Sequence, residues 1–336
     1  MNSLERYQAV LAGEASDILP RVPILMAFAV RFIGSTYARF ASDYRVLVEA
    51  NLRCAEHFDF DQVSAISDPF RETSGFGAEV EFPEHSVPRC VKPPLEDDLD
   101  FTRLAHPDPF ASPRMWDRVQ AIKEYARTVR GHRSILGWVE GPAAEAADLR
   151  GVTNFLMDLA TDPDYACALM DHCVETAVEF AEAQIEAGAD TIGMGDAIAS
   201  QISPAMYAEY VVPREKRIIQ AIHAAGGRVR LHICGNTTHL LPHFRALNCD
   251  IVDLDWQVDL AEARRALGPR QPVVANLDPV RMVMEADPDS IRSALLALYE
   301  TVENPFIAGS GCEIPPDTPE ENLKALCAPI PWRANP

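Results

Sequence analysis

The chain alternates short apolar runs with longer stretches in which apolar positions recur at helical spacing. Eight of the apolar runs have the length of strands and lack strict apolar–polar alternation, which is typical of parallel strands buried on both faces. These runs cover residues 22–30, 62–66, 134–139, 190–194, 228–233, 250–254, 272–276 and 305–309. The pattern therefore predicts eight parallel strands.

Helices are predicted between the later strands. Apolar residues recur every three or four positions from Leu169 to Phe180, and Gly188 then ends that helix. Ser203 followed by Pro204 is typical of the start of the next helix. Eight strands with intervening helices favour an α/β protein with a single (β/α)8 TIM barrel over residues 1–336. A doubly wound sheet is the alternative, but no GxGxxG motif follows a strand.

The segment between the second and third predicted strands, residues 67–133, is too long for a single crossover helix. Within it, residues 77–83 are predicted to be extended and residues 115–130 to be helical. We expect this insertion to border the mouth of the barrel as a lid or substrate wall.

Composition and charge limit the class of protein. The chain has 336 residues, and 48% of them are hydrophobic, which suffices for a large core. The formal net charge of −20 argues against binding to nucleic acid or to an anionic membrane. The first residues show no apolar signal region, and no run reaches the roughly 18 apolar residues of a membrane span. Eight cysteines in this context suggest reduced thiols, and we expect a cytoplasmic location.

Candidate metal ligands follow two of the predicted strands. His232 and Cys234 end the run VRLHIC, and Cys312 follows the run IAGSG. His232 and Cys234 are two residues apart, so their side chains share one face of an extended strand. Imidazole and thiolate are ligands that zinc prefers, and three protein ligands with one open position are typical of catalytic zinc. Because no CxxC pair occurs and 78 residues separate the two cysteines, the fold has to bring these ligands together.

The fourth ligand is left open by the sequence. Asp255 is a candidate oxygen ligand that yields its place to a substrate atom, and Asp253, Glu313 and water are the alternatives. Zinc can lower the pKa of a bound thiol, or withdraw electrons from an ether or thioether heteroatom. Two thiolates and one imidazole leave the ion little net positive charge, so a bound substrate thiolate stays nucleophilic. This argument favours a substrate that reacts through a sulfur atom.

Three polar residues are candidates for a catalytic role around a polar organic substrate. They are Glu140, Asp196 and Asn276. The six other cysteines are expected to act as small buried hydrophobic residues, since that is the usual state of a lone cysteine.

Much of the chain resembles a known family. The segments CDIVDLDWQVDLAEARRALG, ANLDP at 275–279 and PPDTPEEN are similar to the uroporphyrinogen decarboxylase superfamily, whose members are (β/α)8 barrels. The resemblance is densest from Gly188 onward. The decarboxylases place a glycine–histidine turn where this chain has Gly311 and Cys312, and they lack the His-x-Cys pair.

The pair His232-x-Cys234 with a distant Cys312 is instead similar to the zinc methyltransferase branch of that superfamily. This branch includes methylcobalamin:coenzyme M methyltransferases and enzymes that demethylate methylated compounds onto a corrinoid protein. The resemblance implies that these three residues bind zinc and that Asp255 stands where the branch can carry an acidic ligand. No cobalamin-binding DxHxxG motif occurs, so a corrinoid has to arrive on a separate protein or as a free cofactor.

Basic residues also depart from the decarboxylase pattern. The decarboxylases carry an arginine-rich stretch that meets substrate carboxylates, whereas AFAVRFIGSTYARF contains Arg31 and Arg39 only. Arg31 and Arg71 are candidates to hold one anionic group each, and Asn236 is a further candidate for substrate binding. The predicted function is zinc-dependent methyl transfer between a corrinoid and a small substrate, with a thiol favoured and an O-methyl or N-methyl donor as options. A decarboxylase and a non-catalytic metal-binding barrel are the alternatives.

Overall fold

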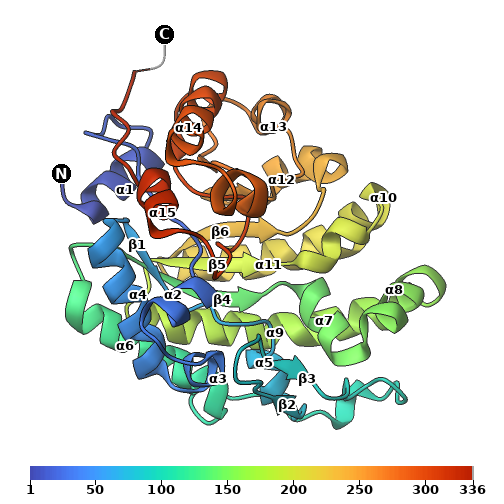
Figure 1. The fold of residues 1–336 in the computed structure, drawn as a ribbon. Helices are drawn as coiled ribbons and strands as arrows, with labels where there is room; N and C mark the ends of the chain where they lie inside the picture. Colours follow the sequence, from blue (N-terminus) through green and yellow to red (C-terminus); the bar gives the residue numbers. More distant parts are fainter. Residues whose placement is uncertain (335–336) are drawn as a thin grey trace.

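The computed structural model of the protein describes residues 1–334, so residues 335 and 336 of the expected domain lie outside the described part. Its centre is a curled parallel sheet with helices on the outside (Figure 1). The strand order is β1-β4-β5-β6-β7-β8-β9. The bounds are β1 (Gln62–Ser64), β4 (Ser134–Glu140), β5 (Thr191–Gly195), β6 (Arg228–Ile233), β7 (Ile251–Leu254), β8 (Val273–Val274) and β9 (Phe306–Ile307).

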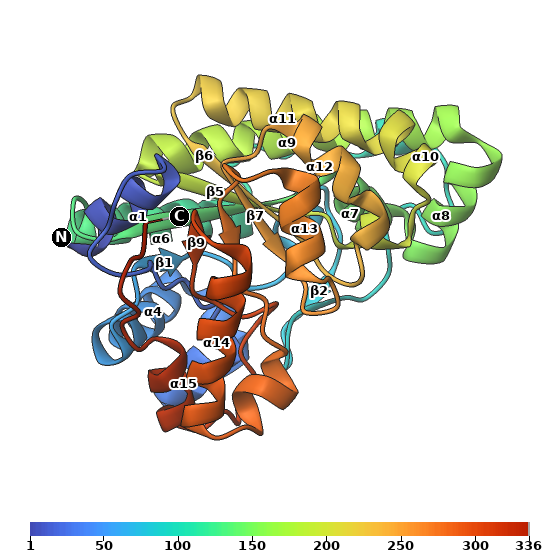
Figure 2. The same ribbon diagram turned by 90° about the horizontal axis from the view of Figure 1, so that it is seen from above.

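Helices precede, separate and follow these strands. They are α1 (Ser3–Leu11), α2 (Ala27–Phe32), α3 (Tyr37–Ser42), α4 (Tyr44–Phe58), α5 (Arg71–Gly75), α6 (Pro113–Val129), α7 (Pro142–Arg150), α8 (Val152–Thr161), α9 (Pro163–Ala187), α10 (Pro204–Met206), α11 (Val212–Ala224), α12 (Leu241–Leu247), α13 (Leu260–Leu267), α14 (Pro288–Val302) and α15 (Glu320–Leu326). Seen from above, α9 lies beside α11, and α14 lies beside α15 (Figure 2). Within residues 1–334, no helix has the length and apolar character that crossing a membrane requires.

The segment before α2 closes the ring of strands. Arg21 pairs in parallel with Ala308 beyond β9, and the amide of Asp61 donates to the carbonyl of Arg21 at 2.8 Å. Further along, Ile24 pairs in parallel with Glu313. Seven strands and this segment therefore complete a β/α barrel, which confirms the predicted fold class.

The expected first strand at residues 22–30 is wrong in its second half. The helix α2 begins at Ala27, with Met26 as its N-cap residue. An apolar run by itself does not distinguish a buried strand from a buried helix. In the folded chain, the carboxylate of Glu313 accepts a hydrogen bond from the amide of Ala27 at 2.6 Å, which supports the first turn of this helix. The other seven predicted strands overlap the observed ones.

The predicted insertion contains one antiparallel hairpin and one regular barrel helix. The hairpin is formed by β2 (Val80–Glu81) and β3 (Arg89–Cys90), where the sequence predicted a single extended segment. The predicted helix is α6, which packs against α4, α9 and β4. Since α6 covers the barrel as an ordinary crossover helix does, the additional residues are those between β1 and α6.

The barrel interior contains a buried ion pair. Arg230 of β6 donates to Asp253 of β7 at 2.7 Å and to Gln62 of β1 at 2.8 Å. Gln62 in turn donates to the hydroxyl of Tyr7, which α1 inserts into an apolar cluster inside the barrel. Because Arg230 and Asp253 pair with each other and Gln62 accepts from Arg230, this group joins β1, β6 and β7 without leaving an unpaired charge.

Candidate metal centre

The first two candidate ligands come from the end of β6. His232 lies between Gly195 of β5 and Asp253 of β7 in the register of the sheet, and its side chain is buried. Cys234 follows one residue after the strand ends. The imidazole Nε2 lies 3.2 Å from the Cys234 Sγ, as expected for two side chains on one face of an extended segment.

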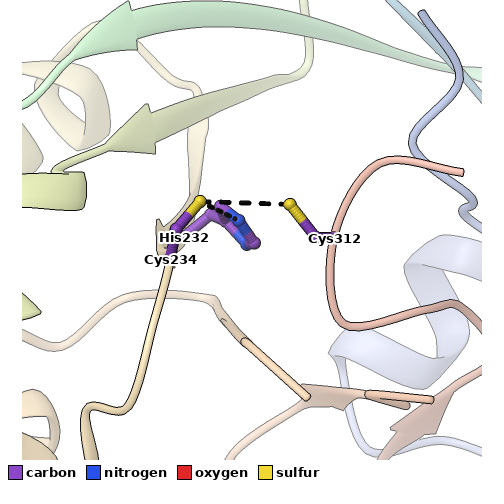
Figure 3. A group of neighbouring side chains, drawn as sticks. All are labelled: His232, Cys234 and Cys312. Atoms are coloured by element: carbon purple, nitrogen blue, oxygen red, sulfur yellow. Dashed lines mark hydrogen bonds between the residues drawn. The ribbon is translucent and has the colours of Figure 1, made fainter. Parts of the chain in front are cut away.

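The third candidate ligand comes from the segment after β9. Ser310 pairs in parallel with Leu277, and Gly311 donates its amide to the carbonyl of Leu277 at 2.9 Å. A Cβ at Gly311 would lie 2.4 Å from the backbone nitrogen of Trp256, so only glycine lets the chain pass here. The turn brings the Sγ of Cys312 to 4.0 Å from the Sγ of Cys234 (Figure 3).

The spacing and chemistry of the three donors suit a tetrahedral zinc ion. One ligand atom from each of His232, Cys234 and Cys312 lies within 4.8 Å of the others. Tetrahedral zinc with ordinary bond lengths requires about 3.8 Å between two sulfurs and about 3.6 Å between nitrogen and sulfur. The observed separations of 4.0 and 3.2 Å are close to these values. Small side-chain movements therefore suffice for the three residues to bind one ion.

An acidic side chain lies beside the other nitrogen of the imidazole. The Oδ2 of Asp253 lies 3.3 Å from the Nδ1 of His232, and Arg230 pairs with the same oxygen. Burial opposes ionisation of Asp253, but Arg230 and His232 outweigh it and lower the pKa of the carboxyl group. A carboxylate on the far nitrogen of a metal-binding histidine sets its tautomer and ring orientation. Asp253 is thus placed beside a ligand, and its other close partner is an arginine.

The two thiols share a hydrogen bond that shifts their pKa values in opposite directions. This bond lowers the pKa of Cys312 to about 5, and burial opposes the shift. The same bond, together with burial, raises the pKa of Cys234. Burial lowers the pKa of His232, but Cys234 and Asp253 outweigh it and raise the pKa well above its usual range. The group therefore favours a thiolate at Cys312, the form in which cysteine binds a metal.

Asp255, the candidate fourth ligand, does not belong to this close group within residues 1–334. Its Oδ1 accepts a hydrogen bond from the amide of Gln257 at 3.0 Å. Asn276 donates to the carbonyls of Asp255 and Val258, at 3.0 and 2.7 Å. The structure thus shows Asn276 holding the loop after β7, and its catalytic role stays a prediction.

The metal-ligand group lies on the wall of a cavity of about 200 Å³. The carboxylate-bearing residues Asp68, Glu140 and Glu313 also line this cavity. Burial raises the pKa of Glu313 to about 7, and Cys312 adds to this shift. The remaining wall is mainly apolar, from Ile24, Met26, Ile66, Pro69, Val87 and Trp138.

Of the other predicted site residues, Glu140 reaches the cavity and Arg71 lies behind it. Arg71 is fully buried and donates to the Oε1 of Glu140 at 2.7 Å. It also lies 3.5 Å from a carboxylate oxygen of Glu72. Burial raises the pKa of Glu140 well above its usual range, and Arg71 opposes the shift. The carboxyl groups of Glu140 and Glu72 thus engage Arg71 behind the cavity wall.

Asp196 is fully buried and belongs to the frame of the barrel. Its carboxylate accepts hydrogen bonds from the amide of Ala144 at 2.7 Å and from that of Ala143 at 3.4 Å, in the first turn of α7. Burial raises the pKa of Asp196 to about 7. Its neighbours Gly195 and Ala197 line the cavity, whereas its carboxylate caps a helix. The structure thus does not bring Asp196 to the metal-ligand group as a reacting residue.

Arg31 and Asn236 also lie outside the cavity wall. Arg31 is exposed and pairs with Asp317. Asn236 is exposed in the turn after β6, where its Oδ1 accepts a hydrogen bond from the amide of Thr238 at 3.1 Å. Their expected contact with substrate therefore has no counterpart among the residues around the cavity.

Sequence reasoning missed the apolar residues that shape the site. Trp138 lies near the end of β4 with its ring centroid 6.4 Å from that of His232. Its position at the carboxyl end of a predicted strand was an available signal for a place at the barrel mouth. Val87, in the hairpin of the insertion, gave no such signal because tertiary packing decides where a hairpin lies.

Fold and site together define a β/α-barrel protein with a His/Cys/Cys group at the carboxyl ends of its strands. The family model described as uroporphyrinogen decarboxylase (URO-D) matches residues 2–330. The chain therefore belongs to the uroporphyrinogen decarboxylase family, which confirms the resemblance seen in the sequence.

Relatives of the chain carry two kinds of name. The uroporphyrinogen decarboxylase of Gloeobacter violaceus is 30% identical over 285 residues, which cover 82% of this chain and 81% of the relative. The methylcobamide:CoM methyltransferase MtaA of Methanosarcina barkeri is 29% identical over 334 residues, covering 96% of both chains. A solved methyltransferase from Methanosarcina mazei has a TM-score of 0.89 at 23% identity and covers 98% of both chains. This last likeness shows the fold.

Proposed function

We propose that the protein is a zinc-dependent methyltransferase that moves a methyl group between a corrinoid and the heteroatom of a small substrate. A thiol is favoured, and an O-methyl or N-methyl compound is the other option. The observation that carries this proposal is the group of His232, Cys234 and Cys312, whose donor atoms lie within 4.8 Å of one another. The similarity to methylcobamide:CoM methyltransferases over nearly the whole chain supports it.

A porphyrinogen decarboxylase is the second candidate, because relatives with that name match the chain about equally well. A substrate with several carboxylates needs cationic side chains around it. Neither Arg nor Lys lines the cavity in the described part of the chain. Arg71 is engaged by Glu140 and Glu72, and Arg31 by Asp317. We therefore favour methyl transfer.

Each residue of the site has a task in this proposal. His232, Cys234 and Cys312 would hold the ion, and Asp253 keeps the imidazole in the orientation that ligation requires. When bound, zinc would supply Lewis acidity that keeps a substrate thiol ionised. The indole of Trp138 forms part of the apolar wall and excludes water from the substrate heteroatom.

The corrinoid is a second substrate in this proposal, and we infer that a separate protein carries it. Its approach has to be from the carboxyl ends of the strands, where the cavity lies. Val87 of the β2–β3 hairpin lines the cavity, which supports a role of the 67–133 insertion as a lid or substrate wall. A cytoplasmic location remains our proposal, and it suits the reduced thiols that the site requires.

Metal analysis with matched variants tests the proposal. We expect about one zinc per chain in the wild-type protein, and loss of zinc in Cys234→Ser and Cys312→Ser. Cys90→Ser is the control, because Cys90 is also partly buried but lies in β3 outside the group. In a methylcobalamin assay with thiols, the zinc-loaded protein should change the cobalt spectrum and the two site variants should not. Full zinc content in the double variant would refute the site.

X-ray absorption spectroscopy tests the fourth position. An oxygen ligand near the roughly 2.0–2.2 Å expected for zinc should be replaced by sulfur when a thiol binds. Asp255→Ala and Glu313→Ala distinguish the two side chains from water. If neither variant alters the spectrum, water or another side chain holds the fourth position.

A further inference from the structure

We propose that the small-molecule substrate is an uncharged apolar thiol no larger than one aromatic ring with a short substituent. This inference deepens the proposed function and rests on it, because it concerns what enters the cavity beside the metal-ligand group. Two properties of the cavity carry the inference, namely its charge and its size.

The wall that faces the substrate is mainly apolar. Ile24 and Met26 come from the segment before α2, and Ile66 follows β1. Trp138 comes from β4, and Val87 comes from the hairpin. Removing an apolar thiol from water is favourable in proportion to its buried area. The same transfer is unfavourable for a charged group that finds no partner.

The arginines nearest the cavity lie behind its wall and are engaged by acidic side chains. Asp68 is held by both terminal nitrogens of Arg114 at 2.7 Å, and Arg71 pairs with Glu140. Asp68 and Glu140 line the cavity, whereas Arg71 and Arg114 do not. An anionic substrate would therefore meet carboxylate oxygens and apolar surface but no free cation among the described residues. The cavity therefore selects against anions, and its mainly apolar wall makes burial of a cation unfavourable unless a carboxylate pairs with it.

The volume sets the size of the substrate. A cavity of about 200 Å³ is smaller than the roughly 300–1,000 Å³ of sites for drug-sized ligands. An apolar cavity of about 150 Å³ accommodates benzene. A thiol with a three-carbon chain or with one aromatic ring therefore fits, and a larger ring system does not.

A series of thiols of similar length tests the charge rule. Propanethiol, mercaptopropionate, mercaptoethanesulfonate and mercaptoethylamine differ mainly in the group at the far end. Cobalt(II) replaces zinc, and entry of a thiolate is followed through sulfur-to-cobalt absorption bands, which do not depend on methyl transfer. We expect propanethiol and benzenethiol to bind at least about tenfold more tightly than the two anionic thiols, a difference of about 1.4 kcal/mol.

A matched pair of variants tests whether a positive charge on the cavity wall changes the preference among thiols. Val87 and Val91 flank β3 and are 47% and 48% exposed, but only Val87 lines the cavity. Val87→Arg should improve binding of the anionic thiols by several fold, and Val91→Arg should leave the order of the thiol affinities unchanged. Because both positions are half exposed, neither variant removes a core side chain.

The outcomes separate this inference from the proposed function. Stronger binding of the sulfonate or carboxylate thiol than of propanethiol overturns the inference, even if methyl transfer occurs. Binding of apolar thiols without any methyl transfer from corrinoid overturns the function and leaves the substrate class standing. If no thiol alters the cobalt bands, both are overturned.

A different observation points to a second metal site, on the outer surface of α9. Ligand atoms of His106, His172 and Glu175 lie within 4.8 Å of one another. Glu179, one turn beyond Glu175 on the same face of α9, lies 2.9 Å from the Nε2 of His106. We infer that two imidazoles and one or two carboxylates bind a divalent transition metal here.

The geometry of His172 supports this second site. Its Nε2 is buried, and no hydrogen-bond partner for it exists within residues 1–334. The ring is held against Phe76 and Phe101, at centroid distances of 5.3 and 5.8 Å. Imidazole and carboxylate suit zinc, nickel or cobalt. His106 belongs to the segment between β1 and α6, so a metal would fasten that insertion to α9.

Calorimetric titration of the tag-free Cys234→Ser/Cys312→Ser protein with Ni²⁺ isolates the second site. We expect about one ion per chain and a higher thermal midpoint with the metal present. His172→Ala and Glu175→Gln should each abolish both effects, and exposed His85→Ala should change neither. Glu175→Gln alters a side chain outside the core, so a folding defect in His172→Ala would not obscure the result. Absence of binding, or binding retained in Glu175→Gln and His172→Ala, overturns the second site.

Discussion

Replacing Asp253 with asparagine separates the support of a metal ligand from the support of the fold. The Oδ2 of Asp253 lies 3.3 Å from the Nδ1 of His232 and accepts hydrogen bonds from Arg230 at 2.7 and 2.9 Å. All three side chains are buried. The substitution Asp253→Asn keeps the size of the side chain and removes its charge, so packing is nearly unchanged while both electrostatic contacts are weakened.

Two magnitudes follow for Asp253→Asn. Breaking a buried ion pair by removing one partner costs about 3–5 kcal/mol, because the remaining charge stays buried. Gln62 still accepts from Arg230 at 2.8 Å, so we expect the lower end of this range. Loss of the carboxylate beside a metal-binding histidine typically lowers metal affinity about 10- to 100-fold, or about 1.4–2.8 kcal/mol. The variant should thus be less stable without metal and should bind zinc more weakly.

Arg230→Gln is the matched control. It breaks the same ion pair and should destabilise the metal-free protein by a similar amount, but it leaves the carboxylate beside His232. Urea unfolding of the metal-free proteins measures the first effect, and competition with a chromophoric chelator measures zinc affinity. Asp253→Asn should lose zinc affinity while Arg230→Gln retains it. Wild-type zinc affinity in a folded Asp253→Asn protein would show that the carboxylate does not orient the imidazole.

Two further predictions concern the turn at the third ligand and the acid stability of the cavity wall. Gly311→Ala places a Cβ 2.4 Å from the backbone nitrogen of Trp256, so the turn has to shift; we expect a loss of about 1–3 kcal/mol in urea unfolding and weaker zinc binding, because Cys312 moves with the turn. Burial opposes ionisation of Asp68, but Arg114 outweighs this effect and lowers the pKa of the carboxyl group to about 2. The ionised carboxylate therefore stabilises the folded protein above pH 4, and this stabilisation is lost as the pH falls from about 4 to 2. Its size is about 2–3 kcal/mol. Asp68→Asn should be less stable at pH 7 and should lose this part of the acid dependence, and an unchanged pH profile of urea unfolding would contradict the assignment.

Local sequence patterns predicted most of the barrel. The strands β4, β5, β6 and β7 lie within about one residue of the predicted runs, because parallel strands buried on both faces need continuous apolar segments. The strand predicted at residues 22–30 was wrong in its second half for the same reason, because a buried helix also needs an apolar segment. Its second half forms α2, and in its first part only Ile24 forms an isolated pair, with Glu313.

The candidate ligands were accessible from the sequence because metal ligation demands particular residue types at strand ends. His232, Cys234 and Cys312 met that demand, and the fold brings their donor atoms within 4.8 Å. Asp196 and Asn276 were predicted from the same kind of position to surround a polar substrate. Their side chains instead hold the first turn of α7 and the loop after β7, because backbone groups distant in sequence reach them first.

The sequence by itself therefore determined most of the order of strands and helices and the three residues that can ligate a metal, since both depend on local residue type and spacing. Only the tertiary structure decided the character of the cavity. Arg71 and Arg114 are distant in sequence from the metal ligands, and they come to pair with Glu140 and Asp68 only when the elements pack together. Pairing of charges depends on distances of a few ångströms between elements, and such distances exist only in the folded chain.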